Sequence, residues 1–165
     1  PASWDNITHI DHIDSRAPQT SLGMSAFHLD AGFTPLFPFG HGLSYADFDY
    51  QNIRVNSYDV ELGRSITISA ELTNRGDFAA DEVAQLYVRD LVASVTRPVK
   101  ELKGFRRVRL EPGESITLDF EVHTDELSFF GRDMRETVEP GQFHAWIGGS
   151  SDTHLRTEFR IIAID

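Results

Sequence analysis

The residues whose spacing most suggests chemistry stand near the start of the chain, where His9 and His12 alternate with Asp11 and Asp14. Two imidazoles three residues apart could share a divalent metal ion if the segment were helical. Nothing marks a helix there, and no glutamate stands where the base of a zinc protease would. We therefore predict no metal site and no cofactor, and we interpret the segment as a polar stretch that its interspersed isoleucines anchor to a surface.

Paired carboxylates could hydrolyse a glycoside, because that reaction uses two carboxyl groups on either side of the scissile bond. The adjacent pairs Asp81-Glu82 and Asp125-Glu126 are expected by chance among 26 acidic residues, and both stand beside turns, where burial is rare. Gly42-Leu43-Ser44 lacks the second glycine of a serine nucleophile elbow. Gly40-His41-Gly42 lacks the further glycine and the following helix of a phosphate-binding loop. None of these residues is therefore predicted to be catalytic.

Composition excludes several classes of partner and site. The 165 residues include 15 Lys+Arg and 26 Asp+Glu, a formal net charge of −11 that would repel a phosphate backbone. No apolar run approaches the roughly 20 residues of a membrane span. The chain has no cysteine, which excludes disulfides, thiolate metal sites and cysteine nucleophiles. We expect a globular protein with no nucleic-acid partner and no membrane span.

The pattern of the chain changes near Asp47. Residues 1–47 show no helical or strand periodicity and hold four prolines and four glycines, so they predict an extended linker that lies on another surface. We expect contacts with domains outside this chain to stabilise the linker, because it can bury too little of itself to offset its ordering entropy. Residues 48–165 alternate apolar and polar positions, which predicts β-strands.

Three runs alternate most regularly: Ser65–Leu72, Ser115–Val122 and Gln142–Ile147. We expect the apolar faces of the first two to form the two halves of one core. In the third, Trp146 is predicted to point outward. The run Val83–Val88 is apolar on both faces, as in a central strand covered on two sides.

Two further strands are predicted to contain a bulge, at Gln51-Asn52 and at Arg106-Arg107, because their alternation slips there by one residue. Proline–glycine turns such as Pro112-Gly113 separate the runs. About seven short strands with such turns predict an all-β fold, an antiparallel β-sandwich of immunoglobulin or fibronectin type III kind with an extended N-terminal segment. A helical turn is expected near Asp125, capped by Thr124 or by Asp125 itself.

Four segments carry a resemblance to a known family. The segment Pro35–Tyr45 reads PLFPFGHGLSY, and it is followed in order by EVAQLYVRD, RPVKELKGF and LEPGES, at Glu82–Asp90, Arg97–Phe105 and Leu110–Ser115. The first resembles the signature that joins the catalytic domains of glycoside hydrolase family 3 enzymes to their C-terminal fibronectin type III-like domain. The other three resemble stretches of that domain.

The resemblance implies a function for the whole enzyme and a non-catalytic role for this chain. In such enzymes a barrel domain supplies the aspartate nucleophile and an α/β sandwich domain generally supplies the acid/base glutamate, and both precede the signature. The resemblance therefore implies that this chain is the C-terminal portion of a retaining β-glucosidase acting on terminal β-D-glucosyl residues. It would stabilise the catalytic domains and contribute to the active-site rim or a dimer interface.

The resemblance also implies the partners and the compartment. The partners would be the N-terminal catalytic domains, a second copy in a homodimer, and the β-glucoside only through the whole enzyme, in the periplasm or outside the cell. A β-xylosidase, an exo-β-glucanase, a carbohydrate-binding module and an unrelated adhesion-type sandwich remain alternatives. The candidates for interdomain packing are Phe37, Phe39, Leu43 and Trp146, whereas Tyr45 and Phe48 are expected in the core. No residue is assigned to substrate binding.

Overall fold

The computed structural model describes residues 36–95 and 97–163, which form strands and one short 3₁₀ turn. The described residues from Phe37 onward belong to one compact unit. In this described part, no helix is long and apolar enough to cross a membrane.

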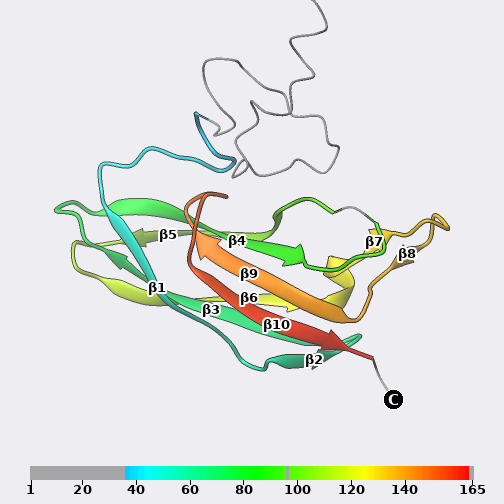
Figure 1. The fold of residues 1–165 in the computed structure, drawn as a ribbon. Helices are drawn as coiled ribbons and strands as arrows, with labels where there is room; N and C mark the ends of the chain where they lie inside the picture. Colours follow the sequence, from blue (N-terminus) through cyan, green and yellow to red (C-terminus); the bar gives the residue numbers. More distant parts are fainter. Residues whose placement is uncertain (1–35, 96, 164–165) are drawn as a thin grey trace, which may run out of the picture. The chain divides into compact units, whose positions relative to one another are not determined.

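Two sheets face each other across the domain (Figure 1). The three-stranded sheet has the order β1-β3-β6, with β1 (Phe48–Val55), β3 (Ser65–Asn74) and β6 (Ser115–His123). The five-stranded sheet has the order β2-β10-β9-β4-β5, with β2 (Asp59–Glu61), β10 (Arg156–Ile162), β9 (Gly141–Gly148), β4 (Ala80–Asp90) and β5 (Glu101–Leu110). A small hairpin joins β7 (Phe129–Phe130) to β8 (Glu136–Thr137).

All strand pairs are antiparallel except β2 with β10, which run parallel. The all-β sandwich expected from the sequence is confirmed, with seven long strands and three short ones among the described residues.

The core lies between the two sheets, because alternate side chains of each strand point inward. Phe143 of β9 and Phe159 of β10 stack with their ring centroids 5.3 Å apart. The largest buried side chains of the three-stranded sheet are Ile66, Ile68, Leu72, Leu118 and Val122. Those of the five-stranded sheet include Leu86, Phe143, Ile147, Phe159 and Ile161.

The expected division of the core between β3 and β6 is wrong. Ile68 pairs with Phe120 and Ala70 with Leu118 across neighbouring strands of the same sheet. The two alternating runs therefore make one continuous apolar face, and the opposite half of the core comes from β4, β9 and β10. Alternation shows that a strand has an apolar face, but it does not show which face lies opposite.

The two predicted bulges have different outcomes. The register of β1 and β3 shifts between Gln51 and Arg54, where Asn52 has φ +54°, so the bulge at Gln51-Asn52 is confirmed. In β5 the register shifts at Lys103, and the bulge expected at Arg106-Arg107 is wrong.

The apolar positions of β5 keep one phase without a bulge at Arg106-Arg107, because Phe105 lies on the outer face. Phe105 is exposed, and the inward position is taken by Gly104, where an added Cβ would lie 3.1 Å from the ring of Phe120. Phe105 therefore lies on the outer face, and Gly104 leaves space in the core for the ring of Phe120.

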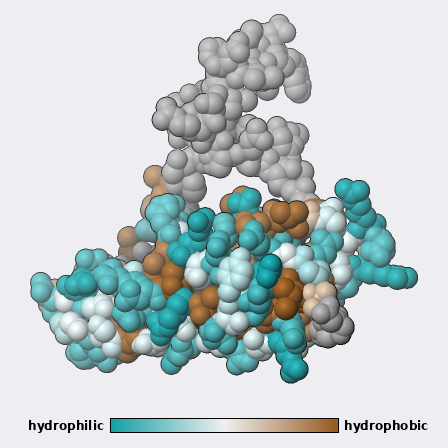
Figure 2. Space-filling view, turned by 60° about the horizontal axis from the view of Figure 1, so that its bottom comes forward, coloured by the Kyte–Doolittle hydropathy of each residue, from teal (hydrophilic) through white to brown (hydrophobic). Residues whose placement is uncertain are grey.

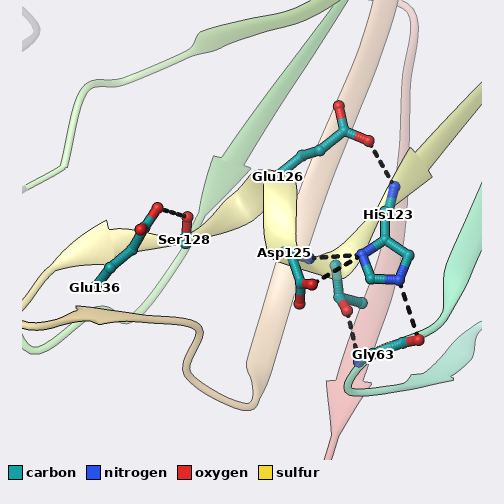
Figure 3. Close-up of polar contacts among 7 residues, drawn as sticks. Gly63, His123, Asp125, Glu126, Ser128 and Glu136 are labelled. Carbon is teal, nitrogen blue, oxygen red and sulfur yellow. Dashed lines mark hydrogen bonds and ion pairs between the residues drawn. The ribbon is translucent and has the colours of Figure 1, made fainter.

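A short 3₁₀ turn, η3 (Thr124–Leu127), ends β6 (Figure 3). Its N-cap is His123, whose Nδ1 accepts from the Asp125 N–H at 3.3 Å, while Glu126 Oε1 accepts from the His123 N–H at 2.9 Å. The helical turn is confirmed, but the cap expected at Thr124 or Asp125 is wrong. Thr124 is buried, and its hydroxyl accepts instead from a backbone N–H of the β2–β3 turn.

The packing of Phe120 makes a testable prediction about the core. Phe120→Ala removes a ring that is 8% exposed and packed on Gly104, and we expect a loss of unfolding free energy on the order of 3–5 kcal/mol. Denaturant titration measures this loss. Phe130→Ala, which truncates an exposed ring, is the control and should change stability by less than about 0.5 kcal/mol. A loss below about 1 kcal/mol for Phe120→Ala would contradict the packing.

Candidate functional site

The signature segment forms a turn at Pro38–His41, where the His41 N–H donates to the Pro38 carbonyl at 3.0 Å. Gly40 has φ +77°, which fits the third position of a type II turn and which a side chain would oppose. Pro38 has no N–H to leave unsatisfied at the start of the turn. We call these four residues the junction turn.

The backbone of the junction turn faces the outer surface of the five-stranded sheet. The Phe39 carbonyl accepts from the Ser151 N–H at 2.9 Å and from the Tyr87 hydroxyl at 3.4 Å. The Gly40 carbonyl accepts from Gln85 Nε2 at 3.0 Å. The buried Gln85 and Tyr87 are the outward residues of central strand β4, so the turn covers the second face of that strand. The central strand predicted from Val83–Val88 is thereby confirmed.

Lys100 covers the adjacent outward residue, Trp146 of β9. Its Nζ lies 4.8 Å from the centroid of the Trp146 ring and donates to the carbonyls of Ser151 and Thr153 at 2.7 and 2.9 Å. Burial lowers the pKa of Lys100 below its usual range. Trp146 points outward, away from the core cluster, and is only 8% exposed, so this chain already covers most of the surface that it could offer to another domain.

The aromatic side chains of the signature are exposed, although the backbone of its turn is bound to the sheet. Phe37 lies against His41 with ring centroids 5.3 Å apart, and the other exposed side chains line two adjoining hollows that share Leu43 and Ser44. We call the exposed set the junction strip; its members are 66% to 100% exposed and comprise Phe37, Phe39, Leu43, Tyr45, Phe78 and Phe105. Figure 2 shows apolar patches, in brown, among the hydrophilic side chains of one face.

The structure corrects one expectation for this segment and confirms another. Tyr45, expected in the core, is fully exposed. Phe48, expected there too, packs against the core. The chain between them turns from the outer face of one sheet to the first strand of the other, and Tyr45 lies before that crossing.

The larger hollow has a volume of about 740 Å³ and contains the Asp81-Glu82 pair. Glu82 Oε1 accepts from the Tyr50 hydroxyl at 2.7 Å. Arg107 donates to Asp81 at 2.6 Å, and this hydrogen bond lowers the pKa of the Asp81 carboxyl. Asp81 is thus bound by a cation and Glu82 by a phenol, and both contacts hold parts of the fold together.

The other candidate groups do not form a reaction centre in the described residues. Burial raises the pKa of Asp90, whose carboxylate accepts from the Val92 N–H at 3.1 Å in the turn after β4. Within residues 36–95 and 97–163, no group of three histidine or acidic side chains could hold a metal ion. The candidate metal segment His9–Asp14 and the predicted linker contacts before residue 36 lie outside the described part.

Residues 82–151 match the family described as the fibronectin type III-like domain. The chain contains a fibronectin type III-like domain. A β-xylosidase of Formosa agariphila is 47% identical over 118 residues, which covers 72% of this chain and 16% of that protein. The periplasmic β-glucosidase of Salmonella typhimurium is 36% identical over 145 residues, covering 88% and 19%. A β-glucosidase of Listeria innocua, solved with isofagomine, matches with a TM-score of 0.77 and 33% identity, covering 91% of this chain and 21% of that one.

These matches confirm the resemblance stated from the signature. The chain spans less than a fifth of the length of the two relatives, and it resembles the fibronectin type III-like portion of β-glucosidases and β-xylosidases. The described candidates Phe37, Phe39 and Leu43 are gathered in the exposed junction strip of this domain, and Trp146 lies under Lys100.

Sequence reasoning missed Gln85 and Tyr87, which bind the junction turn, and Lys100, which binds the neighbouring β9–β10 loop. The available signal was a buried polar residue inside an apolar run. Gln85 is the only amide in Val83–Val88, and a buried amide needs partners.

The Tyr50–Glu82 pair makes a prediction about alkaline stability. Burial, and then the Glu82 carboxylate, raise the pKa of Tyr50 far above its usual value of about 10. Because the folded pKa is the higher one, the stability from the neutral phenol is complete below about pH 10 and is lost as the pH rises further. We expect the unfolding free energy of the unmodified domain to fall more steeply above about pH 10 than that of Tyr50→Phe.

Urea titrations at pH 8, 10 and 11 measure the two slopes, and these pH values bracket the usual tyrosine pKa of about 10. Tyr58→Phe removes a more exposed phenol and leaves Tyr50 in place, so it is the control. Parallel pH profiles for Tyr50→Phe and the unmodified domain would show that Tyr50 does not titrate with folding.

Proposed function

We propose that this domain is a non-catalytic, structural part of a retaining β-glucosidase, and that it supports the catalytic domains of that enzyme through the junction strip. The observation that carries the proposal is the orientation of the signature. Its backbone carbonyls are bound by the sheet, while Phe37 and Phe39 are exposed. A segment held in this way offers its aromatic rings to something outside the sandwich.

The apolar area of the junction strip supports a protein partner. Exposed apolar patches of several hundred Å² on a domain mark interaction sites, and burying each large side chain contributes about 1.5–3 kcal/mol. The strip also begins at Phe37, the first residue of this compact unit. A covalently linked neighbour needs little additional affinity to occupy such a surface, because linkage raises its effective concentration.

The substrate of the whole enzyme is proposed from the relatives. Their names include both β-glucosidases and β-xylosidases, so a terminal β-D-glucosyl residue is our first choice and a β-xyloside the alternative. A carbohydrate-binding role has less support, because Trp146, the outward tryptophan of the sheet, is covered by Lys100. We place the enzyme in the periplasm or outside the cell, as the name of one relative suggests. A contribution to the active-site rim or to a homodimer interface belongs to the same proposal.

The first prediction of the proposal concerns activity. The 165-residue chain alone should not hydrolyse an aryl β-glucoside or an aryl β-xyloside, because the carboxylate pair in its larger hollow is already engaged: Asp81 is bound by Arg107 and Glu82 by Tyr50. The assay is run beside an intact enzyme of this family. Turnover that survives repurification and disappears when a carboxylate of this chain is substituted would overturn the proposal.

The second prediction concerns docking. When the catalytic portion of the enzyme and this chain are expressed separately and mixed, Phe39→Ala should weaken their association by about 2 kcal/mol, roughly 30-fold, because a central aromatic is lost. Phe130→Ala is the matched control, since Phe130 is similarly exposed on the β7–β8 hairpin. Titration calorimetry measures both affinities. Equal affinities for the two variants would contradict docking through the strip.

A further inference from the structure

We infer that Gln85 is a positioning residue that latches the junction turn to the sheet and so sets the direction in which the junction strip is presented. The latch itself is a property of this chain. Its consequence for the catalytic domains rests on the proposed function, and the experiment below separates the two.

The Gln85 side chain uses both ends of its amide. Nε2 donates to the Gly40 carbonyl at 3.0 Å and to the Gly149 carbonyl at 2.7 Å, and Oε1 accepts from the Tyr87 hydroxyl. One buried group therefore ties the junction turn, the β9–β10 loop and strand β4 together. A carboxylate could not donate to the two carbonyls, and an apolar side chain of the same size would leave both carbonyls without their partner.

The β9–β10 loop is a fixed anchor for this latch. Lys100 binds the same loop through the carbonyls of Ser151 and Thr153, and Thr153 Oγ1 donates to the Ile147 carbonyl at 2.9 Å. The Ser151 N–H in turn binds the Phe39 carbonyl. The turn is thus bound both to β4 and to the β9–β10 loop, so its orientation is defined by more than one hydrogen bond.

Gly40 is the counterpart of Gln85. A Cβ at this position would overlap the Gln85 side-chain oxygen and would lie 2.8 Å from the Tyr87 hydroxyl. The close approach of backbone to amide therefore needs glycine for space as well as for its φ of +77°. The direction of Phe37 and Phe39 follows from the same turn, since their backbones belong to it or precede it directly.

Amide hydrogen exchange of the 165-residue chain, followed by NMR, tests the latch. In Gln85→Leu, the His41 and Ser151 amides, which close the turn and bind it, should exchange at least about tenfold faster, while amides of β3 and β6 keep their rates. The matched control is Gln142→Leu, on neighbouring strand β9, whose amide bonds the exposed Tyr58 hydroxyl and does not touch the turn. Unchanged rates at His41 and Ser151, or equal acceleration in the control, would overturn the inference.

Gly40→Ala tests the latch without altering Gln85. The Gln85 side-chain NH₂ protons should lose their protection, and the double variant Gly40→Ala/Gln85→Leu should accelerate the Ser151 amide no more than either single variant. Additive effects of the two substitutions, or Gln85 protons that keep their protection in Gly40→Ala, would overturn the inference. The second of these results remains decisive even if Gln85→Leu unfolds the domain. Phe39→Ala should leave all these rates unchanged. If the exchange results agree with the inference but Phe39→Ala does not weaken docking, the proposed function is disproved and the role of Gln85 in holding the turn is still supported.

Discussion

Strand β4 has no solvent face over its central residues, and the rest of the domain is arranged around that constraint. Ala84, Leu86 and Val88 enter the core, while Gln85 and Tyr87 are buried on the opposite side. A buried amide and a buried phenol need hydrogen-bonding partners, because leaving them without any costs about 1–3 kcal/mol each. The junction turn supplies those partners with backbone carbonyls, so the turn itself is a structural part of the sandwich.

The junction turn separates two kinds of interaction by direction. Its carbonyls face inward, where their partners are defined donors with fixed distances, and its aromatic rings face outward, where burial is non-directional. Hydrogen bonds determine how the turn lies, and under the proposed function the apolar rings would provide the free energy for a neighbouring domain to cover it. The two carboxylates in the larger hollow take part in neither kind of interaction, because Asp81 is bound by Arg107 and Glu82 by Tyr50.

Much of the fold could be predicted from sequence, because alternation and proline–glycine turns act locally. The faces of β3, β6 and β9 and the bulge at Gln51-Asn52 followed from such patterns. The pairing of β3 with β6 and the outward direction of Phe105 did not, because they depend on which strands become neighbours. Phe37 and Phe39 were assigned to interdomain packing from the signature that contains them, whereas Gln85 acquires its role only when residues 40, 85 and 149 come together.

Core and junction are coupled because they occupy opposite faces of one strand. A strand is rigid along its ladder, so a displacement that moves Leu86 in the core also moves Gln85 and Tyr87 beneath the turn. The ladder of β4 with β9 transmits the same displacement to Gly148, next to the Gly149 carbonyl that Gln85 binds. A well-packed core therefore contributes to more than the stability of the domain. It also defines the direction of Phe37 and Phe39, the exposed rings through which a neighbouring domain would be held.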